Sequence, residues 1–119
     1  MILKQIPDLE TEWEILVRKI KLAFGKSTNP DLNSVLFLIG VQELGKGPDN
    51  FSKEEKQNLI HIAICKVLSL SGYYTLDGVD KDGWPHWVLQ KKLPFFDLLS
   101  QEKLLKMHII EYFKTEIKL

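Results

Sequence analysis

The chain has 119 residues, 45% of them hydrophobic, which predicts one domain spanning residues 1–119 with a core of its own. Its 16 basic and 16 acidic side chains give a formal net charge of zero, whereas proteins that bind nucleic acid or anionic membranes usually carry a basic excess. This balance disfavours both kinds of partner. The longest apolar run, Val35–Val41, is also far too short to span a membrane.

Cysteine usage and the start of the chain bear on the compartment. A single cysteine, Cys65, cannot form an internal disulfide, and free thiols are usual in reducing compartments. The first ten residues contain only the short apolar pair Ile2–Leu3, much less than the apolar stretch of a signal peptide. We therefore expect a cytoplasmic protein.

Two helices are expected before residue 46. In the first, apolar residues recur at spacings of three and four, Asp8 is the expected N-cap, and Gly25 ends the helix. The second is expected to begin at Asn29–Pro30, with asparagine as the N-cap, and to stop at Gly45. Its apolar residues cover nearly the whole circumference, which indicates a central position or a subunit interface. The stripe of the first helix comprises Leu9, Trp13, Leu16, Val17, Ile20 and Phe24.

The third helix has the clearest start in the sequence. Ser52 and Glu55 have the spacing of a capping box, and Phe51 stands where a hydrophobic staple is found. The helix is apolar on most sides and is expected to end at Gly72. The second and third helices together have more apolar surface than the other two helices can cover, which predicts a homodimer.

From residue 73 to residue 90 the apolar period changes to two, on either side of the turn-forming run Asp80–Gly83, and this predicts a β-hairpin. The face with Leu76 and Trp87 is the more apolar, so we expect it to face the core. Pro85 has no N–H and indicates an edge strand. The predicted cross-strand pairs are Val79 with Trp84, Asp77 with His86, Thr75 with Val88, Leu76 with Trp87, and Tyr74 with Leu89.

A last helix is expected from about Asp97 to Ile117, with Leu98, Leu105, Ile109, Tyr112 and Phe113 in its apolar stripe. The predicted fold is thus mainly α with one β-hairpin, in the order α-α-α-β-β-α. A winged helix-turn-helix domain with an additional C-terminal helix has the same order of elements.

The residues that could carry chemistry do not form a recognisable motif. His61 and Cys65 are four apart and share a helix face, but His86 and His108 do not supply the second close pair of a structural zinc site. Asp77–Gly83 lacks two essential carboxylates of a calcium loop. Cys65 lies in an apolar run, where its pKa should be raised and the thiol inert. We therefore expect no catalytic residue, no metal and no cofactor.

An aromatic group on the hairpin is a candidate interaction surface. Tyr73, Trp84 and His86 fall on the face that we assign to the outside, and aromatic side chains supply large contact areas in interfaces. Two interpretations stay open at this point. The group binds a partner, or the last helix or the N-terminal segment covers it.

DNA binding is the alternative suggested by the order of elements. In that arrangement the third helix would contact the major groove through Lys53, Lys56 and Gln57, and Lys81 would lie at the tip of the wing. Two acids, Asp80 and Asp82, flank that lysine and would repel phosphates. Nucleic acid is therefore an unfavoured partner.

Two stretches resemble small conserved hypothetical proteins of Bacteroidota-type bacteria. The first contains Gly40-Val41-Gln42-Glu43-Leu44-Gly45 and continues to Phe51-Ser52-Lys53-Glu54, and the second is Asp82-Gly83-Trp84-Pro85-His86-Trp87. The resemblance covers most of the chain after about residue 35. It implies a bacterial, cytoplasmic setting and carries no activity with it.

Three functions follow in order of preference. The first is a non-catalytic interaction or assembly module that acts through the hairpin and a helical face, because a developed core accompanies an absence of catalytic motifs. The second is a winged helix-turn-helix DNA-binding protein. The third is a small enzyme or ligand-binding protein with an unrecognised pocket.

Overall fold

The computed structural model describes residues 8–47, 49–94 and 97–119. Its elements confirm the predicted order and the mainly α class with one hairpin. The last helix continues into a π-helical turn, η1, where the sequence predicted one uniform helix. The elements are α1 (Leu9–Ala23), α2 (Leu32–Leu44), α3 (Lys53–Ser69), β1 (Tyr74–Val79), β2 (Pro85–Leu89), α4 (Leu98–Tyr112) and η1 (Phe113–Ile117).

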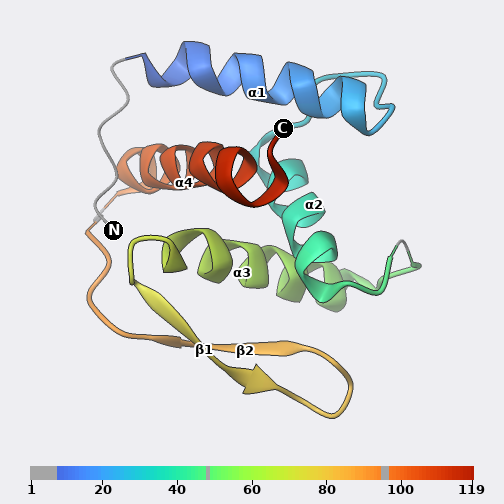
Figure 1. Ribbon diagram of the computed structural model, residues 1–119, viewed down its shortest axis with the longest axis vertical. Coiled ribbons are helices and arrows are strands. Elements are labelled where there is room, and N and C mark those ends of the chain that lie inside the picture. Colours follow the sequence, from blue (N-terminus) through green and yellow to red (C-terminus); the bar gives the residue numbers. More distant parts are fainter. Residues whose placement is uncertain (1–7, 48, 95–96) are drawn as a thin grey trace.

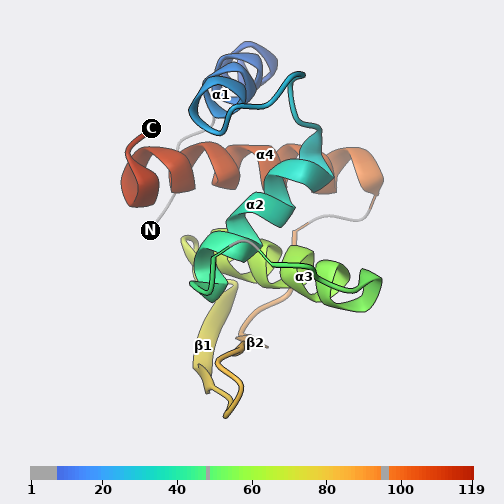
Figure 2. The same cartoon turned by 90° about the vertical axis from the view of Figure 1, so that its right-hand side faces the viewer.

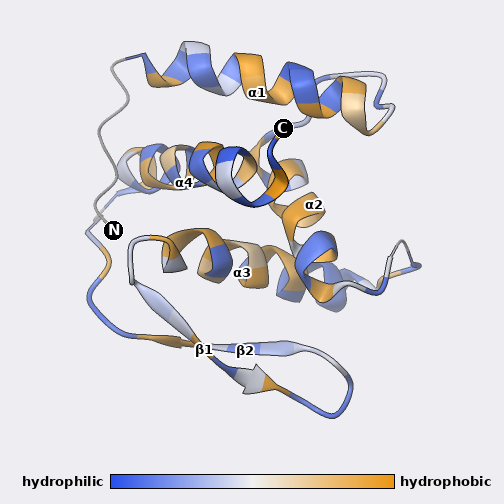
Figure 3. Ribbon diagram, in the orientation of Figure 1, coloured by the Kyte–Doolittle hydropathy of each residue, from blue (hydrophilic) through white to orange (hydrophobic). Residues whose placement is uncertain are grey.

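The elements are stacked in the order α1, α4, α3 and hairpin, and α2 crosses beside the stack from α1 to α3 (Figures 1 and 2). The main core joins all four helices, and α2, coloured as mostly hydrophobic in Figure 3, contributes to it along much of its length. A smaller cluster of Leu44, Leu59 and Ile62 lies beneath the hairpin. The main core comprises Trp13, Leu16, Val17, Ile20, Val35, Leu36, Ile39, Ala63, Val67, Leu68, Leu105, Ile109, Ile110, Tyr112 and Phe113.

The helix starts follow the capping residues, with one correction. The capping box of α3 is confirmed, because the Ser52 hydroxyl accepts the Glu55 N–H at 3.1 Å and the Glu55 carboxylate accepts the Ser52 N–H at 2.8 Å. The predicted N-cap of α2, Asn29, is wrong: Asp31 caps that helix by accepting the Ser34 N–H at 2.8 Å. A carboxylate at an N-cap also interacts favourably with the helix dipole, which favours Asp31 over the upstream asparagine.

Four further details of the helices differ from the predicted pattern. Phe51 does not staple α3, since the residue one turn into the helix is lysine; its ring instead meets the Phe37 ring edge-on, at 6.2 Å between centroids. The third helix ends at Ser69 rather than Gly72. Phe24 caps the end of α1 and is half-exposed. Leu98 is 83% exposed, because it lies at the very start of α4, before the helix reaches the main core.

The hairpin register is confirmed over its inner half and wrong near its tip. Three predicted pairs are present, those of Tyr74, Thr75 and Leu76 with their partners on β2. A β-bulge between Leu76 and Gly78 then shifts the register, so that Gly78 is opposite His86 and Val79 opposite Pro85. Gly78 has a φ of 127°, which favours glycine, and this conformation leaves Asp77 without the predicted partner.

The helices α2 and α3 make an unusually close approach at Gly40. A Cβ atom added there would lie 2.2 Å from the backbone oxygen of Leu59.

The apolar circumference of these helices is largely covered within the chain, by each other, α4 and the hairpin. The surplus apolar surface behind the homodimer prediction is therefore smaller on these helices than the sequence indicated, and the homodimer stays a prediction.

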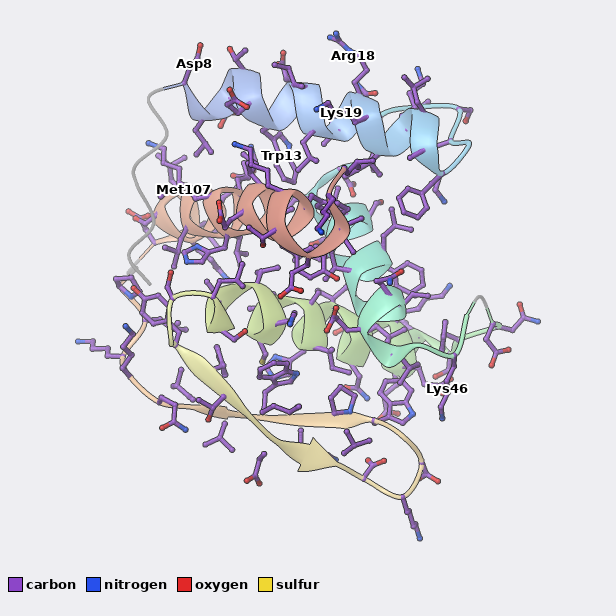
Figure 4. The ribbon with its side chains drawn as sticks, in the orientation of Figure 1. Asp8, Trp13, Arg18, Lys19, Lys46 and Met107 are labelled. Carbon is purple, nitrogen blue, oxygen red and sulfur yellow. The ribbon has the colours of Figure 1, made fainter. Side chains whose placement is uncertain are left out.

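A polar clamp fastens α1 to α4. The Lys106 ammonium lies 3.3 Å from the Glu10 carboxylate and 3.5 Å from that of Glu102, with its nitrogen 5.4 Å from the centre of the Trp13 ring. Figure 4 shows Trp13 extending from α1 towards α4. The clamp gives a nearly buried lysine both ionic and cation–π partners at the α1–α4 contact.

Candidate functional site

His61 and Cys65 lie side by side as predicted, but the Cys65 thiol is not activated. The thiol sulfur and the Nε2 atom of His61 are 3.5 Å apart across one helical turn. Cys65 is fully buried, and burial raises the pKa of its thiol to about 11. Because the thiolate is the nucleophilic form, a thiol with this pKa is unreactive near neutral pH.

The hairpin tip is held by Asp80 and by a contact with the α2–α3 loop. One Asp80 oxygen accepts the N–H groups of Asp82 and Trp84, and the other lies 2.9 Å from the Nε2 atom of His86. These hydrogen bonds lower the pKa of the Asp80 carboxyl, with the bond to His86 as the largest cause. Lys46, labelled in Figure 4, donates to the backbone oxygen of Asp82. The tip is thus braced by short-range polar contacts.

The structure places the predicted aromatic group at two ends of the hairpin. Tyr73 precedes β1, is half-buried, and packs edge-on against His108 with a centroid separation of 6.3 Å. Trp84 precedes β2 at the tip and is half-buried against the smaller cluster. Of the three, His86 is the exposed one. The apolar side chains that the hairpin does expose are Leu76, Val79, Val88 and Leu89.

A contact between the half-buried Ser71 and the buried His108 is one of the polar contacts that sequence reasoning missed. Nδ1 of His108 lies 2.7 Å from the backbone oxygen of Leu104, which can only accept, so Nδ1 donates and the neutral Nε2 accepts from the Ser71 hydroxyl at 2.7 Å. The backbone N–H groups of Ser71, Gly72 and Tyr73 all bond to carbonyls of α3. No oxyanion donors are therefore left in this turn, and we interpret the pair as a clamp between the α3–β1 corner and α4.

This clamp predicts a pH dependence of stability. Burial lowers the pKa of His108, outweighing the bond to Leu104 and the charge of Glu111, which raise it. The unfolded chain takes up a proton near pH 6.5 and the folded chain does not, so stability should fall as the pH drops below about 6.5. Urea unfolding between about pH 7.5 and 5 should show this slope, and His108→Gln should remove it. A wild-type slope in His108→Gln, or its loss in the exposed control His61→Gln, contradicts the assignment.

The described residues offer neither a metal-binding cluster nor a membrane-spanning helix. Within residues 8–47, 49–94 and 97–119, no three histidine, cysteine, aspartate or glutamate side chains are grouped closely enough to hold a metal ion. In the same residues, none of the helices has both the length and the apolar character that crossing a membrane requires.

The residues expected to contact DNA in the winged-helix alternative are exposed but do not form a basic surface. Lys53, Lys56 and Gln57 lie on the first turns of α3, next to the exposed Glu54. Lys81 lies at the hairpin tip between two aspartates. The first half of α3 therefore has a polar face, which the sequence analysis did not expect, but its charges are mixed.

Two neighbouring hollows lie along α2 and α3, one reaching the α1–α2 loop and the other reaching α4, and together we call them the groove between α2, α3 and α4. The N-terminal halves of these helices gather on one side of the molecule, at the right in Figure 2. One part, the lysine half, encloses about 470 Å³, and the other, the leucine half, about 260 Å³. The lysine half is lined by Lys26, Ser27, Thr28, Pro30, Asp31, Asn33, Ser34, Phe37, Leu38, Lys56 and Ile60. The leucine half is lined by Leu32, Asn33, Leu36, Ile60, Ile64, Leu98, Gln101, Glu102 and Leu105.

The two halves adjoin each other, since Asn33 and Ile60 line both. The floor follows α3, where Lys56, Ile60 and Ile64 stand on successive turns. Leu98, on the α4 side, is the most exposed apolar side chain of the described residues. An apolar leucine half, one strongly exposed leucine and a largely polar lysine half fit a ligand with one apolar and one polar side.

Comparison with known proteins adds no further likeness. No protein-family model, curated protein or solved structure matches this chain.

Proposed function

We propose that this protein is a non-catalytic interaction module that holds a helical segment of a partner protein in the groove between α2, α3 and α4. The observation that carries the proposal is the groove of two adjoining hollows along α2 and α3, with Ile60 and Ile64 on its floor and Leu98 exposed at its α4 edge. A helix-lined groove of this kind accepts an amphipathic helix, whose apolar residues at i, i+3/i+4 and i+7 enter it.

The length of the floor fits such a ligand. Lys56 and Ile64 are eight residues apart on α3, which corresponds to about 12 Å at the α-helical rise, or about two turns of a ligand helix.

The reactive groups described above support a binding role rather than a catalytic one. The Cys65 thiol has a raised pKa, and the Ser71 hydroxyl is engaged by His108 beside backbone N–H groups that are already bonded.

The hairpin is another exposed apolar surface, and its edges carry features that discourage strand addition. Pro85 and the bulge before Gly78 both interrupt a regular ladder, as is common in edge strands that avoid pairing with other chains. We therefore place the binding surface in the groove rather than along the hairpin edge.

Selection of displayed random peptides of about 16 residues, long enough for four helical turns, tests the proposal. We expect enrichment of peptides with an apolar helical stripe, and about tenfold to hundredfold weaker binding to Leu98→Asp, because one well-buried leucine side chain is lost from the contact. Leu99→Asp is the matched control: Leu99 is adjacent and 62% exposed but does not line the groove.

Fluorescence anisotropy of synthetic copies of the enriched peptides gives the affinities. Equal weakening by Leu98→Asp and Leu99→Asp would contradict the proposal, because the groove then has no special part in binding. Absence of any apolar-stripe enrichment would contradict it as well. Leu98 is the first residue of α4, where an acid is compatible with the helix dipole, so the variant should fold.

A further inference from the structure

From the charges of the groove, and resting on the proposed function, we infer that its ligand is an acidic amphipathic helix whose carboxylates lie against the lysine half. Lys26 and Lys56 approach this half from the α1–α2 loop and from α3, and both are exposed. Among the described residues, the salt bridges involve Lys66, Lys106 and His86 and include neither of these two lysines. Their charges are therefore available to a ligand.

The one acid in the lysine half does not cancel them. Asp31 accepts the Ser34 N–H at 2.8 Å as the N-cap of α2, and this bond lowers the pKa of its carboxyl. The carboxylate stays ionised, so two lysines and one aspartate give the lysine half a formal charge of +1. The lining of the leucine half has no lysine or arginine, and its acid, Glu102, lies 3.5 Å from the Lys106 ammonium. The net positive charge of the groove therefore lies at its lysine end.

This asymmetry determines that the ligand is acidic and which half of the groove its acidic part occupies. Apolar residues of the ligand cover Ile60 and Ile64, and aspartate or glutamate residues one or two turns away lie near Lys56. Exposed ion pairs contribute modestly, so each matched pair should strengthen binding by about twofold to fivefold and lose this effect at high salt. Acidic residues thus set selectivity and orientation, while the apolar stripe supplies most of the affinity.

The same displayed library tests this inference when selection is repeated on charge variants. Wild-type protein should enrich aspartate and glutamate over lysine and arginine beside one end of the apolar stripe. In Lys26→Glu/Lys56→Glu that preference should reverse. Lys53→Glu/Lys81→Glu, which changes the net charge equally outside the groove lining, should keep the acidic preference.

Each outcome separates the two levels of the proposal. Peptides that keep the apolar stripe and the Leu98 dependence but show no charge preference overturn the acidic ligand and leave the groove function standing. A preference that follows Lys53 and Lys81 also overturns the acidic ligand. Binding that is insensitive to Leu98→Asp overturns both. Sedimentation of the protein alone provides a further check: a dimer that Leu98→Asp dissociates would make a second copy the occupant and overturn the inference.

Discussion

Gly40→Ala is expected to destabilise the protein by about 3 kcal/mol, the upper part of the range for overpacked cores. In an ordinary helix interior the same change stabilises by about 1 kcal/mol, because alanine is the better helix former. Here the new methyl group would meet the backbone oxygen and carbon of Leu59, at 2.2 and 2.7 Å. Backbone atoms cannot rotate away, so α2 and α3 must separate and lose their contacts.

Chemical unfolding followed by circular dichroism measures this change, and Gly45→Ala is its control. Gly45 has a φ of 73° and nothing within 4 Å of an added Cβ, so alanine there incurs only the cost of a left-handed conformation, about 1–2 kcal/mol. A Gly40→Ala variant as stable as the wild type would show that the two helices do not cross as closely as described.

Tyr112→Ala is the second substitution with a large expected effect, about 3–5 kcal/mol, which is typical of removing a buried aromatic ring. Tyr112 is completely buried, and its hydroxyl donates to the Glu43 carboxylate at 2.7 Å. Burial, with the bond to Glu43 and the nearby acids, raises the pKa of its hydroxyl, so it remains a donor throughout the neutral range.

Tyr112→Phe separates the ring from the hydroxyl. It should cost about 1.5–3 kcal/mol, as expected for a hydrogen bond to a charged group. Glu43 would retain only a 3.9 Å contact with Lys66, which itself lies 3.3 Å from Glu116 in η1. Unfolding free energies of the two variants give the comparison. Equal losses would mean that the hydroxyl dominates, contrary to the packing described.

Local signals in the sequence identified the elements and several of their ends. The Ser52–Glu55 spacing predicted the start of α3 because both capping partners belong to the same turn. Local reasoning failed where two neighbouring solutions were possible. Asn29 and Asp31 are both able to cap α2, and the helix dipole favours the carboxylate of Asp31. The bulge at Gly78 depends on how the strand bends, which local sequence does not determine.

The groove and the clamps could not be predicted, because each joins residues that are distant in sequence. Ser71 and His108 are 37 residues apart, and Glu10 and Lys106 are 96 apart. The groove combines four segments, and one of its exposed residues, Leu98, has the helical spacing of a core residue. Periodicity tells which side chains are apolar but not where a helix extends past its neighbours.

Chemical-shift mapping of ¹⁵N-labelled protein with an enriched apolar-stripe peptide would locate the binding surface. We expect the largest amide shifts to cluster on the first halves of α2, α3 and α4, around Asn33, Ile60 and Leu98, and to disappear in Leu98→Asp. The largest shifts on the hairpin instead, around Leu76 and Val88, would contradict the groove as the binding surface.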